Sequence, residues 1–170
     1  MRRLNQLSSL IEISQSINTA MALDELLDRI LKIATSVLGT VTCALYLKEV
    51  DGQLRLKTQT GLAYDAWPPE FAVGEGLVGA VAQHQRPLIV SDIGGDSRVA
   101  HLEHLRRHGM NQFFGVPLMV AGETLGVLAT VEAPVDHLDA DREEFLMLLA
   151  HQIAIALHKE TLSRQLRESY

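Results

Sequence analysis

The sequence predicts an α+β domain with a mostly antiparallel sheet, and three observations support this class. Two pairs of segments show a period of two, and each pair is joined by a short turn, Asp51-Gly52 or Ala121-Gly122. Stretches with a helical period and broad apolar faces precede the first pair and follow the last. The expected order is helix, helix, strand, strand, helix, then strand, helix, strand, strand, helix, which favours hairpins over parallel crossovers. Long helices should therefore cover one face of the sheet, and short helices and irregular loops should close over the other.

The bulk properties restrict the functional class. A chain of 170 residues can form one domain, residues 1–170, with a core that needs no disulfide or metal. A net charge of −6 argues against a nucleic-acid surface, and no stretch approaches the roughly 20 apolar residues of a membrane span. The single cysteine, Cys43, excludes an intramolecular disulfide. We expect a soluble, cytoplasmic protein without a nucleic-acid or membrane partner.

The first two predicted helices differ in character. Residues 1–22 carry a heptad-like series in steps of three and four: Leu4, Leu7, Ile11, Ser14, Asn18 and Met21. Such a helix either packs on its own domain or pairs with a second copy of the chain. Asp24 is expected to cap the second helix, which has a broad apolar stripe and ends before Gly39.

Strand parity assigns the two faces of the sheet. In the strand at residues 41–48, the even-numbered members are expected toward a pocket and the odd-numbered members under the long helices. In the strand at residues 123–133, the wholly apolar odd-numbered set is expected under the helices: Leu125, Val127, Ala129 and Val131. Thr130 and Glu132 would then point toward the pocket.

The stretch at residues 74–92 organises the pocket side. It reads as a glycine turn, a short apolar helix, a break at Pro87 and a buried strand. Residues 61–73, which contain Trp67-Pro68-Pro69, are expected to form an irregular loop. A polar loop and a short polar helix at residues 101–108 follow.

The last predicted helix begins after a cap at Asp139 and has acidic residues in its first turns. Between residues 145 and 157 it is apolar nearly all round, so we expect deep packing. Beyond Lys159 few apolar residues remain, which indicates that the helix leaves the domain. Residues 1–22 and 158–170 are therefore expected to be helical extensions used for dimerisation or signal transmission.

Five motifs, in their order and spacing, resemble a GAF domain over essentially the whole chain. They are FAVGEGLVG at residues 71–79, RPLIVSD at 86–92, GVPL at 115–118, GETLGVL at 122–128 and LAHQIAIA at 149–156. The resemblance implies a five- or six-stranded antiparallel sheet with a small-molecule cavity on the face opposite the helices. It also implies dimerisation through terminal helices and control of an attached kinase, cyclase, phosphodiesterase or transcription activator. No effector domain is visible in the sequence, and neither the ligand nor any cofactor can be named from it.

The sequence argues against several specialised GAF domains. Cys43 does not match the chromophore-attaching cysteine of bilin-binding members, so no covalent bilin is expected. One cysteine cannot run the thiol–disulfide chemistry of GAF enzymes that reduce free methionine sulfoxide. The Asn-Lys-x-Asp-type motif of cyclic-nucleotide GAF domains is not visible. We therefore expect a regulatory domain rather than an enzyme.

Parity and the resemblance together give a candidate ligand-binding set: Tyr46, Val78, Asp92, Asp96, Arg98, Phe113, Thr130 and Glu132. Asp92, Asp96 and Arg98 lie in the loop beside the expected pocket mouth. They either contact a ligand or make ordinary turn and ion-pair contacts. Glu132 either accepts a hydrogen bond from a ligand in a closed site or lies exposed to solvent at the end of its strand.

Three histidines raise a metal or haem interpretation, because His101, His104 and His108 share one face of the short polar helix. Charged flanking residues instead favour a solvated cover, so neither a metal nor haem is expected there.

A second function stays open beside the small-molecule sensor. The chain could be a dimerisation and scaffolding module whose pocket is filled by its own aromatic side chains: Trp67, Phe71, Phe113 and Phe114. A filled pocket would favour this alternative, and a cavity with converging polar groups would favour the sensor.

Overall fold

The computed structural model describes residues 20–38, 42–61, 67–98, 111–132 and 140–169. In these ranges a six-stranded, wholly antiparallel sheet has the strand order β3-β2-β1-β6-β5-β4, which places β1 and β6 at its centre. The elements, in chain order, are α2 (Ala20–Leu38), β1 (Thr42–Lys48), β2 (Leu54–Gly61), β3 (Glu70–Phe71), α3 (Gly76–His84), β4 (Leu88–Val90), the 3-10 helix η1 (Ile93–Gly95), β5 (Gln112–Val120), β6 (Glu123–Glu132) and α5 (Ala140–Ser169).

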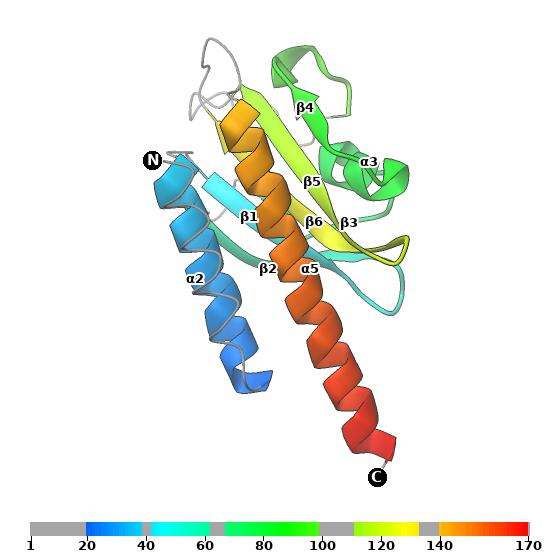
Figure 1. The fold of residues 1–170 in the computed structure, drawn as a ribbon. Helices are drawn as coiled ribbons and strands as arrows, with labels where there is room; N and C mark the ends of the chain where they lie inside the picture. Colours follow the sequence, from blue (N-terminus) through cyan, green and yellow to red (C-terminus); the bar gives the residue numbers. More distant parts are fainter. Residues whose placement is uncertain (1–19, 39–41, 62–66, 99–110, 133–139, 170) are drawn as a thin grey trace.

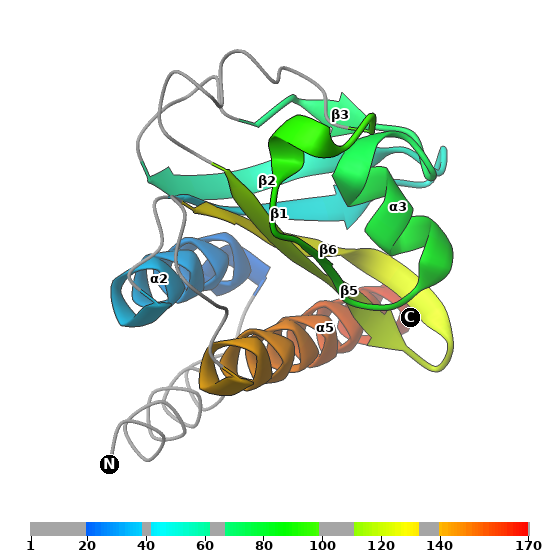
Figure 2. The same ribbon diagram turned by 90° about the horizontal axis from the view of Figure 1, so that it is seen from above.

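The layers follow the predicted α+β class. Figure 1 shows α2 and α5 side by side along one face of the sheet, with α5 continuing past the sheet edge. Figure 2 shows α3 over the opposite face. The short strand β3 lies within the stretch that was expected to be irregular, and it extends the sheet beside β2.

Two separate hydrophobic clusters lie on the two faces of the sheet. The helix-side cluster joins α2 and α5 to the sheet through side chains such as Leu27, Leu45 and Leu128. The pocket-side cluster lies between the sheet and α3 and includes Tyr46 and Val78. Both faces are therefore buried, and each central strand contributes to both cores.

Two expectations about the long helices are wrong. Since α2 begins at Ala20, Asp24 lies inside the helix and is not its cap; its carboxylate instead pairs with Lys57, Nζ to Oδ1 at 2.7 Å. The helix α5 is not packed all round either, because Leu148 and Ile155 are 36% and 45% exposed. Asp141 and Glu143 lie in its first turn at the positive end of the helix dipole, as expected, and the expected cap Asp139 lies outside the described residues.

A β-bulge at Leu125 interrupts the alternation of β6. Leu118 pairs with Gly126, whereas the next residue of β5, Met119, pairs with Thr124, so Leu125 is skipped in the ladder. Leu125 packs against the helix-side cluster, as expected. From Val127 to Val131, each side chain lies on the face opposite to that extrapolated from Leu125.

The bulge makes the predicted faces of β6 wrong. The pocket-side cluster, not the helix side, holds the rest of the apolar set, namely Val127, Ala129 and Val131. Thr130 lies opposite Cys43 in the β1–β6 pairing. Because directly paired residues of an antiparallel sheet share a face, Thr130 lies on the helix side with Cys43. On β1 the expected faces are correct.

Two backbone features explain local residue choices. The β5–β6 turn has positive φ at both Ala121 (51°) and Gly122 (81°), the geometry that matches the twist of a tight hairpin. At Gly126, a β-carbon would lie 2.1 Å from the carbonyl oxygen of Tyr46, so only glycine lets β6 approach β1 this closely.

Within the described ranges, no helix has both the length and the apolar character needed to cross a membrane.

Candidate functional site

The candidate site is the pocket-facing side of the sheet, where α3 and the segment before it cover β1, β2, β5 and β6. Its centre is Tyr46 on β1, which is fully buried. The Tyr46 ring meets the ring of Trp67 edge to face at a centroid distance of 6.3 Å and the ring of Phe71 at 5.4 Å. Three aromatic side chains, from β1, from the segment that precedes β3 and from β3 itself, therefore occupy the floor of this side.

The two polar atoms of this aromatic group are both hydrogen-bonded. The Tyr46 hydroxyl donates to the carbonyl oxygen of Pro68 at 2.6 Å. The indole Nε1 of Trp67 donates to Thr42 Oγ1 at 2.8 Å, and Thr42 Oγ1 donates to the carbonyl of Thr60 at 2.8 Å. Burial raises the pKa of the Tyr46 phenol, so it remains a neutral hydrogen-bond donor at physiological pH.

The helix α3 forms the lid of the aromatic group. Leu77, Val78 and Val81 are buried in the pocket-side cluster together with Phe113 of β5 and Ile93 of η1. The sequence predicted this inward position for Val78 and Phe113. Figure 2 shows how the helix crosses above the sheet.

Side-chain hydrogen bonds form at both ends of α3, and those at its C-terminal end reach the sheet. At its start, the carboxylate of Glu75 accepts from the backbone N–H of Ala72 at 3.0 Å. At its end, Gln85 adopts a left-handed conformation with φ 55° and sends its side chain toward the β5–β6 turn. Its Nε2 donates to the carbonyl of Gly122 at 3.0 Å and to Thr124 Oγ1 at 3.1 Å.

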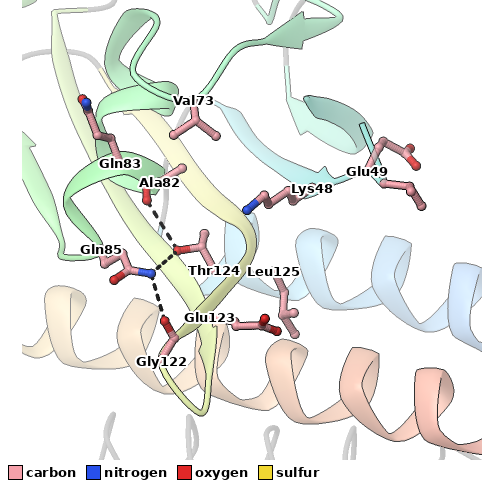
Figure 3. A pocket seen from close by; sticks show the side chains of 11 residues that line it. Lys48, Glu49, Val73, Ala82, Gln83, Gln85, Gly122, Glu123, Thr124 and Leu125 are labelled. Atoms are coloured by element: carbon pink, nitrogen blue, oxygen red, sulfur yellow. Dashed lines mark hydrogen bonds between the residues drawn. The ribbon is translucent and has the colours of Figure 1, made fainter. Parts of the chain in front are cut away.

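A hollow of about 520 Å³ lies beside the hydrogen bonds of Gln85, at the end of the sheet where β1 ends and β6 begins. Figure 3 shows Gln85 and Thr124 on one of its walls and Lys48 reaching toward them from the end of β1. A second hollow of about 460 Å³ lies on the other side of the β1–β2 connection, between α2 and α5. Neither hollow is lined by Tyr46, Trp67 or Phe113, so both lie apart from the aromatic floor.

Asp92, Asp96 and Arg98 make local contacts at the edge of the site. The Asp92 carboxylate accepts from the backbone N–H of Gly94 at 3.0 Å and caps η1. The Arg98 guanidinium donates to both carboxylate oxygens of Asp96, at 2.9 Å and 2.6 Å. These hydrogen bonds hold the pKa of Asp96 below its usual range. Of the two interpretations of this loop, the one with ordinary turn and ion-pair contacts describes the contacts observed.

Several predicted positions fall elsewhere. Thr130 is buried on the helix side, where its hydroxyl donates to the carbonyl of Phe114 at 3.4 Å, so its predicted pocket position is wrong. Glu132 is the last residue of β6 and pairs with Gln112, and its side chain lies outside the described part. His101, His104 and His108 also lie outside the described residues. In the described ranges no group of three or more histidine, cysteine, aspartate or glutamate side chains could hold a metal.

The prediction missed three contributors to the site, Thr42, Trp67 and Ile93, as members of its binding set. The parity of β1 had already placed Thr42 on the pocket side, and only its role as the acceptor for an indole was unforeseen. Trp67 precedes two prolines, which restrict the backbone at this position. That restriction could have been used to predict that the Trp67 side chain is held against the sheet. Ile93 carried no such signal, because its inward direction depends on the short helix η1.

Comparisons with known proteins agree on the family and the fold. A family model described as "GAF domain" matches residues 20–158. The Nif-specific regulatory protein of Herbaspirillum seropedicae is 29% identical over 127 residues, which cover 72% of this chain and 23% of that protein. The chain thus spans less than a quarter of the relative that it matches.

Solved structures give the same fold. The GAF domain of a phosphoenolpyruvate-protein phosphotransferase from Coxiella burnetii is 25% identical, with a TM-score of 0.81 over 96% of this chain and 98% of that one. The free methionine-R-sulfoxide reductase of Neisseria meningitidis, solved with its substrate, is 15% identical, with a TM-score of 0.78 over 96% and 94% of the two chains. At 15% identity the second likeness concerns the fold alone.

Proposed function

Because the chain belongs to the GAF domain family, we propose that it is a sensory domain that binds a small molecule between the sheet and α3 and signals through its terminal helices. A regulatory role is supported by the similarity to the Nif-specific regulatory protein. The match covers only 23% of that protein, which suits a module that controls an effector located elsewhere in a longer chain or in a partner. The effector would be a kinase, cyclase, phosphodiesterase or transcription activator.

One observation carries the signalling part of the proposal: the central strands bury side chains in both cores. On β1, Ala44 and Tyr46 lie under α3, whereas Cys43 and Leu45 lie under α2 and α5. A ligand that displaces Tyr46 or α3 must shift the same strand against the long helices, because close-packed interiors transmit small displacements. The ligand must bind one arrangement more tightly than the other for this shift to occur.

The site chemistry favours a ligand with an apolar or aromatic body and few hydrogen-bonding groups. The floor offers aromatic faces, and its polar atoms are the Tyr46 hydroxyl, the Trp67 indole and the Thr42 hydroxyl. These atoms form hydrogen bonds with one another or with backbone carbonyl groups of Thr60 and Pro68. A ligand could exchange such bonds for its own without leaving a buried polar atom unsatisfied.

A second function is favoured by the aromatic packing. Trp67, Phe71 and Phe113 all lie inward with Tyr46, so the described part of the pocket side is filled by the chain itself. Phe114 does not join them, because it lies in the helix-side cluster. In this alternative the domain is a dimerisation and scaffolding module without a ligand.

We propose a regulatory rather than catalytic role. Cys43 is buried on the helix side of β1, and the sheet separates it from the aromatic floor. A thiol in apolar surroundings is a poor nucleophile.

Native mass spectrometry of the purified protein tests the sensor directly. A non-covalent mass that is lost on denaturation would support a bound ligand. If the protein is recovered empty, cyclic nucleotides, anions and amino acids can be screened by fluorescence, because Trp67 is the only tryptophan in the chain and lies in the aromatic floor of the site. A Trp67→Phe variant must lose the fluorescence response while thermal-shift binding persists. Failure of every compound in both assays would favour the scaffold.

We further propose that two copies associate through residues 1–22 and the C-terminal part of α5. The extension of α5 past the sheet edge supports this arrangement (Figure 1). Light scattering at micromolar concentration is the simplest test, and a monomer throughout that range would contradict the dimer.

A further inference from the structure

The hollow of about 520 Å³ at the end of the sheet has three walls, which come from distant parts of the chain. One wall is the end of β1 with the connection that follows it, and the second is α3 with the turn before it. The third wall is the β5–β6 turn with the start of β6. The volume lies within the roughly 300–1,000 Å³ that is typical of small-molecule sites. Tyr46, Trp67 and Phe71 do not line this hollow, so it is separate from the aromatic floor.

Hydrogen bonds join the second wall to the third and give the hollow a fixed shape. Gln85 Nε2 donates to the carbonyl of Gly122 at 3.0 Å and to Thr124 Oγ1 at 3.1 Å. The Thr124 hydroxyl donates to the carbonyl of Ala82 at 3.4 Å, near the end of α3, where carbonyl groups lack partners within the helix. Thr124 and Ala82 are both buried. A ligand would therefore meet a site that already exists in the free protein.

Two side chains of opposite charge line the hollow: Lys48 at the end of β1 and Glu123 at the start of β6. Figure 3 shows the Lys48 ammonium group extending toward Thr124 and the Glu123 carboxylate beside Leu125. Within the part of the chain that the structure describes, neither side chain has an ion-pair or hydrogen-bond partner. Both charges are thus available to a ligand.

The other carboxylate of the hollow, Glu49, is directed elsewhere. Figure 3 shows it pointing away from Lys48. Its charge is among those that raise the pKa of Arg55, after the hydrogen bond from Arg55 to Asp51. Glu49 therefore does not neutralise Lys48.

Aliphatic surface accompanies the two charges. Leu125 is half-buried in the hollow, and Val73, in the turn before α3, is 43% exposed. Val50, in the β1–β2 connection, is fully exposed. Among the described residues the hollow has no aromatic lining, so it offers apolar contact without a ring for stacking. These walls suit a ligand with a short aliphatic body.

We infer that this hollow binds a small zwitterion with an aliphatic body, such as a free aliphatic amino acid, with its carboxylate at Lys48 and its ammonium group at Glu123. A ligand with only a negative charge would leave its carboxylate facing Glu123, and one with only a positive charge would face Lys48. A zwitterion complements both charges. The inference does not depend on a ligand between the sheet and α3, because it concerns a second site. A ligand here would contact both α3 and the β5–β6 turn, so it would favour the position of α3 over the aromatic floor.

Isothermal titration calorimetry of the full chain with three probes tests the inference. The probes are L-leucine, isocaproate, which lacks the ammonium group, and isoamylamine, which lacks the carboxylate. We expect the Kd of L-leucine to be at least about threefold lower than that of either single-charge probe, the size of effect that a solvent-exposed charge pair can give.

Two variants assign the charges. Lys48→Met should raise the Kd of L-leucine at least about threefold without weakening isoamylamine, and Glu123→Gln should do the same without weakening isocaproate. The matched controls are Lys159→Met on α5 and Glu25→Gln on α2, which remove exposed charges outside the hollow and should leave the Kd of L-leucine unchanged. Circular dichroism checks that each variant remains folded.

Amide NMR spectra locate the bound probe. L-leucine should shift the signals of Val73, Gln85 and Thr124. It should also slow hydrogen exchange of the Gln85 amide, which donates to the carbonyl of Val81 at 3.0 Å. Binding without slower exchange would overturn the effect on α3.

The remaining outcomes separate this site from the proposed sensor pocket. No binding of L-leucine, equal binding of the three probes, or a Kd unaffected by Lys48→Met would each overturn the inference. Signal shifts centred on Tyr46 and Trp67 would also overturn it, and they would support a ligand between the sheet and α3 instead. Binding that shifts the hollow and leaves the emission of Trp67 unchanged would support the second site.

Discussion

Tyr46 and Trp67 meet edge to face at 6.3 Å, with their ring planes inclined by 66°, and each is hydrogen-bonded to the segment that contributes the other. Tyr46 on β1 donates to Pro68, the residue after Trp67. Trp67 donates to Thr42, which stands at the start of β1. This reciprocal arrangement fastens residues 67–69 to the central strand. Any ligand that enters between the sheet and α3 must meet this pair.

Removal of the Tyr46 hydroxyl tests that fastening. A Tyr46→Phe variant keeps the ring contacts but leaves the partly buried carbonyl of Pro68 without this donor, so it should lose about 1–2 kcal/mol of unfolding free energy. For a chain of this length, that loss corresponds to a fall in Tm of about 2–8 °C. Thermal denaturation measures it, and the emission of Trp67 should shift as its surroundings loosen. Thr161→Ala is the control, because it removes a hydroxyl whose bond to Leu157 is exposed, and it should lose little stability. Equal stability of Tyr46→Phe and the unmodified chain would contradict the role given to this bond.

The close approach of β6 to β1 makes Gly126 intolerant of a side chain. In a Gly126→Ala variant the new methyl group would meet the backbone oxygen of Tyr46, so β6 must move away from β1. We expect a loss of more than about 2 kcal/mol of unfolding free energy, measured by urea denaturation. Gly95→Ala is matched to it, since the nearest atom to its added carbon would be Asp92 Oδ2 at 3.8 Å. That variant should stay within about 0.5 kcal/mol of the unmodified chain. The prediction fails if both substitutions are tolerated equally.

The Asp96–Arg98 pair should produce a local pH dependence. Hydrogen bonds from Arg98 lower the pKa of Asp96 in the folded state relative to the unfolded state. Their stabilising effect is therefore complete above the unfolded pKa of an aspartate, about 3.9, and is lost as pH falls through the lower folded pKa. An Arg98→Gln variant should raise the pKa of Asp96 toward its ordinary value. Titration of the Asp96 carboxyl carbon by NMR measures the change, and Arg55→Gln should leave Asp96 unaffected. Since the Arg98 side chain is 42% exposed, the effect on overall stability should be small.

The thiol of Cys43 should be chemically inert in the folded protein. It lies fully buried in the helix-side cluster, so a thiol reagent can reach it only when the chain opens. We expect reaction with a chromogenic disulfide reagent to be at least 100-fold slower in buffer than in denaturant. A Val50→Cys variant supplies the control, because position 50 is fully exposed in the β1–β2 connection and its thiol should react at once. Rapid reaction of Cys43 in the native protein would instead reopen the possibility of a thiol enzyme.

The dimer proposed through the C-terminal part of α5 can be tested on the outward face of this helix, where Leu148, Ile155 and Leu162 recur every seven residues and are exposed. An Ile155→Asp variant places a charge at the centre of this exposed face while leaving the buried side of α5 unchanged. It should remain folded by circular dichroism and become monomeric in light scattering. Lys159→Asp changes the charge on the same helix outside the series of Leu148, Ile155 and Leu162, and it should retain the dimer. Unchanged association of Ile155→Asp would exclude this face of α5.

The amino-acid sequence was enough to predict the α+β class, the hairpin at Ala121-Gly122, the long terminal helix and the inward positions of Tyr46, Val78 and Phe113. These features depend on local signals: turn residues, the periodicity of apolar residues, and acidic residues at the start of a helix. Each of these signals acts within a few positions of the chain. The comparisons confirm the family that the motifs indicated. The ligand-binding role of the predicted set remains a proposal.

The faces that the side chains from Val127 to Val131 of β6 occupy could be known only from the folded structure. Both faces of this sheet are buried, one under α2 and α5 and the other under α3, so an apolar side chain fits either and alternation cannot distinguish them. The bulge at Leu125 then reverses the parity, and the pairing of Thr130 with Cys43 fixes it. Strand register relates segments that are distant in the sequence, and it depends on which backbones can approach each other. Gly126, for example, allows the backbone of β6 to approach that of β1 at Tyr46. No single stretch of the chain contains that information.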